Sequence, residues 1–318
     1  MSSNTDTQDQ IREIAWMHYV GGLTQAQIAT RRGLSKMKVH RFVQAAHEQG
    51  LVKIFVDNVP TDCMALEDRL VAEFGLTSCT IVPDVDEPQT MDVSMPAVAS
   101  AGARFLHGRL ENTNTMMVGV GSGRTMSAIV KAMPTIRRPK AEFISVTGDF
   151  AALSDANPFE VIHALIDKTQ GKGYAFTAPL VVDSADDRDL FLRQRSIRSS
   201  FERLRDASMI MIGVGHVGPG SFFRSFGLIT DAEQGDMIRE GIVADLAGNL
   251  VDDSGAFIET GIAQRMLGMD PDLLREREVV AICAGIEKWQ AARAALRTGC
   301  LNGFISSHAV AERILNSL

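Results

Sequence analysis

The first twenty residues carry apolar side chains at the spacing of an amphipathic helix. The apolar positions of this segment are Ile11, Ile14, Ala15 and Met17. Two glycines follow them, Gly21 and Gly22. Because glycine is disfavoured inside helices and common just beyond their ends, the pattern predicts a first helix that stops near this glycine pair.

Two further helices are predicted before residue 50. Thr24 has the hydroxyl of a helix N-cap and opens the second, and Ser35 opens a third that runs to about Gln49. The third repeats apolar residues at i, i+3, i+4 and i+7, the spacing of one buried helix face. These residues are Val39, Phe42, Val43 and Ala46. The opposite face is polar and carries Lys36, Lys38, His40, Arg41 and Gln44.

A glycine joins the second and third helices. Gly33 can adopt the positive φ of a tight turn, with the small Ala29 before it and the aliphatic Val39 after it. Such residues at these offsets let two helices cross closely. The arrangement is typical of a helix-turn-helix, whose second helix enters the major groove of DNA through its N-terminal residues.

The hydrophobic pattern changes after residue 50. The stretch LVKIFVDN alternates apolar and polar residues and predicts a short strand beside the helices, and VPTDC after it predicts a linker. From about Met64, helical patterns alternate with short apolar strands, which is the signature of α/β architecture with a largely parallel sheet. The predicted strands are Thr80–Val82, Met116–Val120, Phe143–Val146, Tyr174–Ala178, Met209–Val214, Val279–Ala284 and Phe304–Ser306. The sequence thus predicts two domains, a helix-turn-helix domain at 1–58 and a larger Rossmann-like α/β domain at 59–318.

Charge divides the chain at the same place. The formal net charge is -7, yet residues 1–58 contain seven Lys and Arg against five Asp and Glu, and the remaining 260 contain 25 against 34. Between Ile14 and His47 there are five basic residues and no acidic one, a local field that suits a polyanion. Charge alone also fits a solvated helix face, but its coincidence with the helix-turn-helix spacing favours DNA. The residues expected at the DNA are Thr24, Gln25, Ser35, Lys36, Lys38, His40 and Arg41.

The loops that follow the predicted strands are the places to look for a ligand, because open α/β sheets bind ligands outside the carboxyl ends of their strands. In VGVGSGRTMSAIV, Gly121 and Gly123 follow a strand and Thr125 opens a helix. Free N–H groups at a helix N-terminus attract phosphate and can donate to sugar hydroxyls. The loop matches neither a Walker loop nor a complete GxGxxG pattern, and glycines also end strands for structural reasons alone. Taken singly, Lys288 fits a solvated side chain as well as a ligand contact.

Cysteine usage excludes two classes of protein. Four cysteines lie far apart, with no CxxC pair and no histidine at zinc-site spacing, so neither a disulfide framework nor a metal site is indicated, and no cofactor is expected. The polar start MSSNTDTQDQ has no apolar signal core, and no apolar run approaches the roughly 18 residues that span a bilayer. A cytoplasmic protein is expected.

Taken in order, the motifs resemble those of the SorC family of sugar-responsive bacterial transcriptional regulators. The segment GLTQAQIATRRGLSKMKVHRFVQAAHEQGLVKI is similar to the family's DNA-binding segment, and VGVGSGRTM to its sugar-binding strand, loop and helix. Three later segments also match, namely NPFEVIHALIDKTQGKGYAFTAPLVVDS, ADLAGNLVDDSG and CAGIEKWQAARAALRTG. The resemblance spans nearly the whole chain, from about Ile11 to Leu315.

The resemblance implies an effector domain with the fold of sugar-phosphate isomerases and glucosamine-phosphate deaminases, usually assembled as a tetramer on operator DNA. The effector would be a small sugar, a sugar phosphate or a polyol, and the regulator a repressor of a carbohydrate or polyol operon. The positions implied around the effector are Gly121, Ser122, Gly123, Arg124, Thr125, Thr147, Gly148, Asp149, Gly215, Asp245 and Lys288.

Three positions depart from the family pattern. Ser122 stands where many relatives carry a bulky residue between the two glycines, and Ala244 and Ala284 replace glycines beside the implied pocket. These departures concern the identity of the effector. The motifs are most similar to those of regulators of polyol operons, erythritol among them.

Two other functions remain open to the sequence. One is an aldose–ketose isomerase or deaminase, in which Asp149 or Asp245 would serve as the base. An enzyme of that kind has no use for the basic helix-turn-helix, which disfavours this alternative. The other is a DNA-binding protein whose second domain only oligomerises.

Overall fold

The computed structural model describes residues 2–49, 51–52, 60–84, 87–113, 115–150, 161–259 and 261–318. The chain forms two compact units, Met1–Phe55 and Val56–Leu318. Each has a hydrophobic core of its own. Within the described residues, no helix combines the length and the hydrophobicity needed to cross a bilayer, and all four cysteines are free thiols.

The N-terminal unit is helical, as its pattern predicts. Its elements are α1 (Ser2–Ala15), the π-helix η1 (Trp16–Val20), α2 (Gln25–Arg32) and α3 (Lys36–Glu48). The first helix thus continues through a π-turn and ends at Gly21. One buried cluster joins the helices and includes Ile14, Ile28 and Val39. Because all three side chains have almost no exposed surface, tertiary packing holds these short helices together.

The connection between α2 and α3 has the conformation that the sequence predicts. The Thr24 hydroxyl accepts the Gln27 N–H, and the Gln27 side chain accepts the Thr24 N–H, which makes a capping box at the start of α2. Gly33 ends α2 with φ 64° and ψ 32°, the left-handed region that favours glycine. Ser35 caps α3 by accepting the Lys38 N–H. The turn is therefore fixed by three local signals.

Two expectations for the region after α3 have different outcomes. The strand predicted in LVKIFVDN falls on residues 53–58 for the most part, which lie outside the described residues. The linker predicted in VPTDC is wrong for its second half, because α4 begins at Thr61 and runs to Phe74. Cys63, within that segment, is fully buried in the core of the C-terminal unit. Burial against that core explains why these residues form the first turn of α4 and not a linker.

The C-terminal unit is built on a parallel sheet of seven strands in the order β1-β10-β9-β5-β2-β3-β4. Its strands are β1 (Ser78–Val82), β2 (Met116–Val120), β3 (Ala141–Ser145), β4 (Lys172–Tyr174), β5 (Met209–Gly213), β9 (Glu278–Cys283) and β10 (Gly303–Ser307). Every predicted strand overlaps one of them. The fourth differs most, since it was predicted at Tyr174–Ala178 and ends at Tyr174.

A second, antiparallel sheet of three strands has the order β6-β7-β8. Its strands are β6 (Gly215–His216), β7 (Ile242–Leu246) and β8 (Asn249–Asp252). The hydrophobic pattern of the sequence predicts none of these strands. The sheet brings Gly215 beside Asp245, thirty residues further along the chain.

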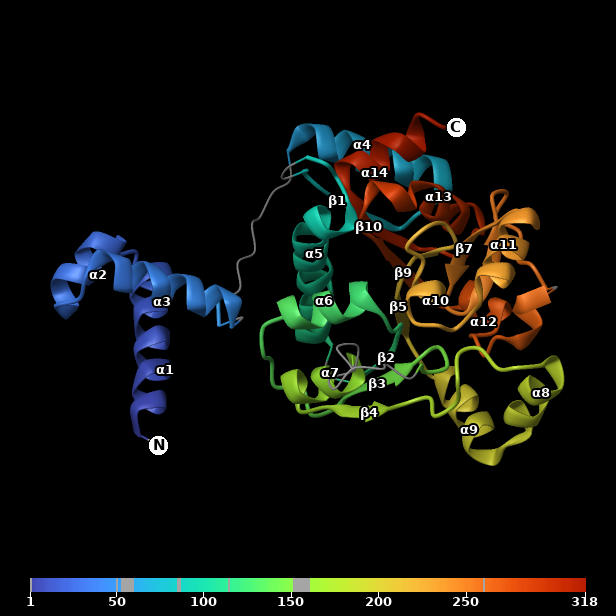
Figure 1. Ribbon diagram of the computed structural model, residues 1–318, viewed down its shortest axis with the longest axis horizontal. Coiled ribbons are helices and arrows are strands. Elements are labelled where there is room, and N and C mark those ends of the chain that lie inside the picture. Colours follow the sequence, from blue (N-terminus) through green and yellow to red (C-terminus); the bar gives the residue numbers. More distant parts are fainter. Residues whose placement is uncertain are drawn as a thin grey trace. The chain divides into compact units, whose positions relative to one another are not determined.

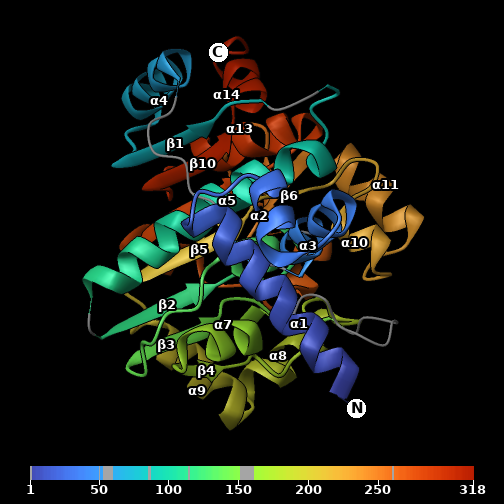
Figure 2. The same ribbon diagram turned by 90° about the vertical axis from the view of Figure 1, so that its left-hand side faces the viewer.

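Helices cover both faces of the large sheet (Figure 1). The helices described in the C-terminal unit are α4, α5 (Met91–Asn112), α6 (Arg124–Ala132), α7 (Val161–Thr169), α8 (Ala185–Arg193), α9 (Arg195–Leu204), α10 (Phe222–Ser225), α11 (Asp231–Arg239), α12 (Pro271–Glu276), α13 (Trp289–Arg297) and α14 (His308–Leu315), with the 3-10 turns η2 (Gly261–Arg265) and η3 (Ile286–Lys288). In Figures 1 and 2, α4, α13 and α14 gather beside β1 and β10.

Side chains alternate across the sheet between two packed layers. Val279, Ala281 and Cys283 of β9 belong to the core shared with α4, α13 and α14. Val280 and Ile282 point to the other face and are also buried. A strand buried on both faces reads as a continuous apolar run, which is why VVAIC was recognisable in the sequence.

Candidate functional site

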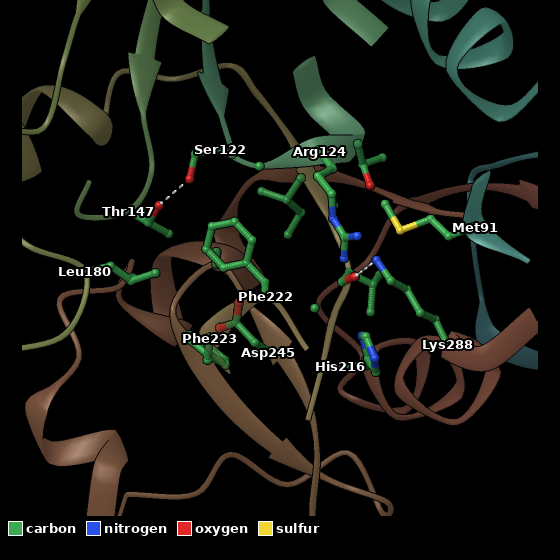
Figure 3. A pocket seen from close by; sticks show the side chains of 18 residues that line it. Met91, Ser122, Arg124, Thr147, Leu180, His216, Phe222, Phe223, Asp245 and Lys288 are labelled. Carbon is green, nitrogen blue, oxygen red and sulfur yellow. Dashed lines mark hydrogen bonds between the residues drawn. The ribbon is translucent and has the colours of Figure 1, made fainter. Parts of the chain in front are cut away.

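A cavity of about 80 Å³ lies at the carboxyl ends of the strands of the large sheet. Its walls come from the segments that follow β2, β3, β5 and β9, together with β7 of the small sheet. Figure 3 shows side chains from these segments around one space. This is the edge at which open α/β sheets bind their ligands.

The loop after β2 forms a wall with the properties of an anion site. Gly123 has φ 98° and ψ -178°, a conformation nearly restricted to glycine, and α6 starts directly after it. No side chain caps α6. Arg124 and Thr125, its first two residues, both line the cavity. The free N–H groups of the first turn and the helix dipole therefore favour a negative group at this wall.

Two cations meet at the cavity. Lys288 retains 6% of its surface, and its Nζ donates to the Val214 carbonyl at 3.3 Å. The Arg124 guanidinium approaches it from α6 (Figure 3). Among the described residues, neither side chain forms an ion pair. Burial lowers the pKa of Lys288 and the nearby Arg124 lowers it further, while Cys283 and Glu287 oppose the shift.

An acid stands at another wall of the cavity. Asp245, on β7, accepts the Gly248 N–H on Oδ1 at 3.0 Å. Desolvation raises the pKa of the Asp245 carboxyl to about 7. The neighbouring strand approaches so closely that a Cβ added to Gly215 would lie 2.9 Å from the Asp245 Cβ. The absence of a side chain at Gly215 therefore lets β6 pair closely with β7 beside Asp245, whose carboxyl lines the cavity.

His216 is the next residue of β6 and also lines the cavity. Its Nε2 lies 3.1 Å from the Pro219 carbonyl, which can only accept, so Nε2 carries the hydrogen. Burial lowers the pKa of His216 below the usual value, and the Nδ1 atom is left as an acceptor at neutral pH. The side chain is thus a neutral polar group beside two cations.

The rest of the lining combines hydroxyls with apolar surface. The Ser122 and Thr147 hydroxyl oxygens lie 3.5 Å apart, from the loops after β2 and β3. Phe222, at the start of α10, presents its ring to the cavity and packs edge-on against Phe150, with ring centroids 4.6 Å apart. Leu180 adds aliphatic surface. A ligand with both hydroxyl groups and C–H faces suits these walls.

The cavity brings together nine of the eleven residues that the sequence predicts around an effector. These are Gly121, Ser122, Gly123, Arg124, Thr125, Thr147, Gly215, Asp245 and Lys288. Gly148 and Asp149 do not line it. The Gly148 N–H donates to the Leu267 carbonyl, and a Cβ at this position would meet the Pro179 backbone at 2.4 Å. Asp149 binds the segment after β4 through its backbone and lines a neighbouring hollow.

Several lining residues are not among those that the sequence predicts around an effector. They are Met91, Leu180, Ile212, Gly213, Val214, His216, Phe222, Phe223 and Ala247. His216 belongs to the loop GHVGPGS, which the strand pattern places at the ligand edge, so the loop was recognisable although the histidine was not singled out. The phenylalanines follow that loop directly and carry no motif of their own.

The N-terminal unit carries a separate candidate surface on α3. Lys36, His40 and Arg41 are exposed, and among the described residues none of them has a hydrogen-bond or ion-pair partner. Lys38 is half-buried, with its Nζ 5.4 Å from the centre of the Phe42 ring. Ser35 and Thr24 are exposed at the helix starts, with Gln25 half-buried beside them. Free cations at the N-terminal half of a helix are suited to phosphates and base edges.

Comparison with known proteins places this architecture in a family. Residues 58–316 match the family Sugar-bind, described as "Putative sugar-binding domain". The chain belongs to this family. It is 31% identical over 301 residues to the erythritol catabolism regulatory protein EryD of Brucella abortus, a match that covers 95% of this chain and 94% of that protein. It is 26% identical to the transcriptional regulator LsrR of Klebsiella pneumoniae, covering 97% and 93%.

A solved structure of a full-length regulator has the same fold. The full-length sorbitol operon regulator SorC of Klebsiella pneumoniae superposes with a TM-score of 0.70 at 20% identity, covering 98% of this chain and 99% of that one. The predicted α/β fold and the resemblance to SorC-type regulators are confirmed. Both relatives, EryD and LsrR, are transcriptional regulators, and the alignments cover nearly their whole length. The chain is therefore a sugar-binding transcriptional regulator and not an isomerase or deaminase.

Proposed function

We propose that residues 1–58 bind operator DNA through α3 and that the cavity in residues 59–318 binds a small phosphorylated polyol or sugar that controls this binding. The regulator would act in the cytoplasm as a repressor of a carbohydrate or polyol operon. One observation carries the choice of effector: Lys288 and Arg124 meet without an acidic partner beside the uncapped start of α6.

A phosphate accounts for the unpaired charge. A buried ammonium costs free energy unless it is paired, and Lys288 uses one of its three donors, on the Val214 carbonyl. The three terminal oxygens of a phosphate can together accept from Lys288, from Arg124 and from N–H groups of α6. A neutral polyol would leave the buried Lys288 ammonium without an ionic partner, whereas Arg124 is exposed and stays hydrated. This comparison favours the anionic ligand.

The carbon chain of the effector would lie along the remaining walls. Asp245, His216, Ser122 and Thr147 offer groups that can accept from or donate to hydroxyls. The Phe222 ring offers an apolar face for C–H groups. The small cavity suits a short molecule, and a four-carbon polyol is consistent with the name of EryD, which refers to erythritol.

The DNA-binding half of the proposal rests on α3. Ser35 and Lys36 stand at the N-terminal end of this helix, the end that reaches base edges in helix-turn-helix proteins. Arg41 lies one turn further along, exposed and without a partner among the described residues. A single helix-turn-helix covers few base pairs, so we expect a dimer or tetramer, joined by the C-terminal unit, to bind paired half-sites.

The effector can be tested by thermal unfolding with four probes: erythritol, erythritol 4-phosphate, erythrose 4-phosphate and inorganic phosphate. We expect the phosphorylated probes to raise Tm, because a ligand at 100 times its Kd adds about 2.7 kcal/mol of stability. Erythritol alone should have little effect. A response to erythritol and none to either phosphorylated probe would contradict the anionic effector. No response to any sugar or polyol would favour a domain that only oligomerises.

A further inference from the structure

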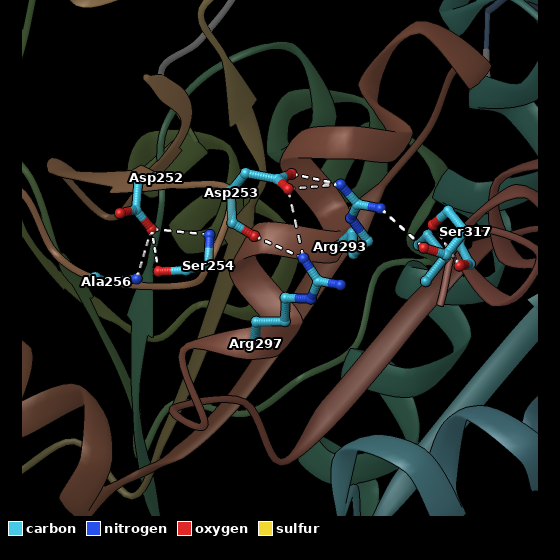
Figure 4. Close-up of polar contacts among 8 residues, drawn as sticks. Asp252, Asp253, Ser254, Ala256, Arg293, Arg297 and Ser317 are labelled. Carbon is cyan, nitrogen blue, oxygen red and sulfur yellow. Dashed lines mark hydrogen bonds and ion pairs between the residues drawn. The ribbon is translucent and has the colours of Figure 1, made fainter. Parts of the chain in front are cut away.

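The turn after β8 and the helix α13 are joined by a charged contact outside the cavity (Figure 4). Asp253 accepts from Arg293 Nη2 on both carboxylate oxygens, at 2.6 and 2.8 Å. Arg297, one turn further along α13, donates to the Asp253 carbonyl at 2.8 Å. The contact therefore holds α13 at two successive turns.

The turn that carries Asp253 is itself rigid. Asp252 accepts from the N–H groups of Ser254 and Ala256 and from the Ser254 hydroxyl, at 2.6 to 2.9 Å. Gly255 has φ 90°, and a Cβ there would lie 2.5 Å from the Arg297 carbonyl carbon. The turn thus rests against the backbone of α13, with Asp253 fixed toward the helix.

The two elements that this contact joins each carry a charged residue of the cavity. The β7–β8 hairpin carries Asp245 on β7, and the segment leading into α13 carries Lys288. Lys288 precedes the first residue of α13, and Arg293 follows five residues later on the same helix. A shift of α13 relative to the hairpin therefore changes the position of Lys288 relative to Asp245.

The packing between these elements is close. Four alanines of α13 are buried and share a core with residues of the hairpin, including Ala244 and Leu246. They are Ala291, Ala292, Ala294 and Ala295. These small side chains let the helix approach the strands closely, but they carry no directional contact. The ion pair of Asp253 with Arg293 adds one.

Arg293 is held in a setting that depends on its acid. Its side chain retains 10% exposure, and its Nη1 donates to the Ser317 carbonyl at 3.2 Å. The guanidinium lies 5.0 Å from the Trp289 ring, while its Nε has no partner. Removing the carboxylate would leave a poorly solvated cation, which is costly, so Arg293 would move toward water and draw α13 with it.

The geometry points to Asp253 as a positioning residue for the effector: through Arg293 and α13 it sets Lys288 at the distance from Asp245 that the ligand requires. This inference rests on the proposed function of the cavity. Asp253 touches no ligand, and its effect passes through Lys288. At metal sites, residues that orient a ligating side chain from behind change affinity by about 10-fold or more, and we take the lower end of that range for Asp253.

The test is a double-mutant cycle with inorganic phosphate and erythritol 4-phosphate as probes, measured by calorimetry on the full chain. Asp253→Ala should weaken binding of erythritol 4-phosphate about 10-fold. In the Lys288→Ala background, the same change should have no further effect, because its route is already removed. Asp272→Ala is the matched control, since Asp272 pairs with Arg275 on the exposed surface of α12. Its binding should equal that of the parent.

A second measurement needs no ligand. The pKa of Lys288 can be followed by NMR at its Cε signal, assigned by loss in Lys288→Ala. If Asp253→Ala releases α13, Lys288 becomes better solvated and its pKa rises toward the ordinary value, whereas Asp272→Ala leaves it unchanged. Asp253→Asn serves as the variant if the alanine form does not fold.

The outcomes separate the two proposals. If the parent binds neither probe, the anion site fails, and the Lys288 titration still decides the role of Asp253. Additive losses in the double mutant, or a Lys288 pKa that Asp253→Ala leaves unchanged, would overturn the positioning role and leave Asp253 as a structural contact. Weaker binding in the single mutant alone, with a raised Lys288 pKa, would support it.

Discussion

Helix α3 and the cavity both carry cationic side chains without an ion-pair partner among the described residues. The two regions differ in the solvent exposure of these side chains. On α3, Lys36 and Arg41 are exposed. In the cavity, Lys288 is buried, while Arg124 at the start of α6 is exposed. The exposed cations are screened by salt within a Debye length of about 8 Å, whereas the buried Lys288 ammonium is screened much less.

The difference suits two kinds of anion. Exposed cations attract a long polyanion at many points, and their contribution falls steeply as salt rises. A buried cation has already lost its hydration, so one well-placed phosphate oxygen gains more from it. The same residue chemistry can therefore serve DNA in one unit and a small effector in the other.

The largest expected effect is a pH dependence of the free energy of unfolding that comes from a group in the cavity, Asp245. The pKa of Asp245 is raised to about 7, so between pH 4 and 7 the folded chain holds a proton that the unfolded chain has lost. Stability should fall as pH rises through this window, by up to about 1.4 kcal/mol per pH unit from this group, and level off above pH 7. His216 gives an opposite slope, because its pKa is lowered on folding.

Asp245→Asn separates these contributions. The difference between parent and variant in denaturant unfolding at several pH values isolates the Asp245 slope, since His216 is common to both. We expect the difference to change between pH 5 and 7 and to be constant above about 8. A difference that does not vary with pH would show that the carboxyl titrates normally.

The next largest effect concerns the buried cation. Lys288→Ala should weaken binding of erythritol 4-phosphate by about 1.5 to 3 kcal/mol, which is roughly 10-fold to 150-fold. Calorimetric titration measures this directly. Added salt should change the parent's affinity only modestly. A steep salt dependence would mean that the anion binds at the surface.

For Arg41 on α3, in contrast to Lys288, we expect binding to depend on salt. Arg41→Ala should weaken DNA binding by about 1 to 3 kcal/mol, at one base position if Arg41 contacts guanine and over all sequences if it contacts phosphate. In the phosphate case, the slope of log affinity against log salt should drop by about one. Fluorescence anisotropy with a duplex selected from a random library distinguishes the cases. Unchanged affinity at low and high salt would remove Arg41 from the interface.

The smallest effect tests how α2 is held. Thr24→Ala removes the hydroxyl that accepts the Gln27 N–H and should cost about 1 kcal/mol of stability in the N-terminal unit. Thr24→Ser keeps the cap and serves as the control. Thermal unfolding of the two variants checks the difference. Equal stabilities would mean that tertiary packing alone fixes the start of α2.

The sequence was most informative where local chemistry decides the structure. Thr24, Gly33 and Ser35 signal the helix ends by their own side chains or conformations, and the structure confirms all three. The cavity wall at Gly123 to Thr125 was recognisable for the same reason. The continuous apolar runs of the parallel strands were equally clear, since both faces of the sheet are covered.

Long-range pairing was harder to predict. The strand β6 has only two residues, and it pairs with β7 nearly thirty residues further along the chain. Two residues are too few to show the alternation that predicts a strand. His216 and Phe222 reach the cavity through that pairing and through α10. Asp149 illustrates the reverse case, because its loop is at the expected edge but its backbone is bonded to the segment after β4. The sequence therefore predicts which loops lie at the ligand-binding edge of the sheet, but tertiary contacts determine which of their side chains face the cavity.

In the proposed mechanism, a ligand in the cavity of the C-terminal unit controls DNA binding by α3 of the N-terminal unit. The most direct measurement is an anisotropy titration of the selected duplex with erythritol 4-phosphate added, for the parent, Thr125→Val and Lys288→Ala. A ligand shifts this equilibrium only by its differential affinity for two conformations, so both variants should bind DNA as the parent does and respond only at effector concentrations about 10-fold higher or more. If well-folded variants respond at the parental concentration, the effector does not act through this cavity.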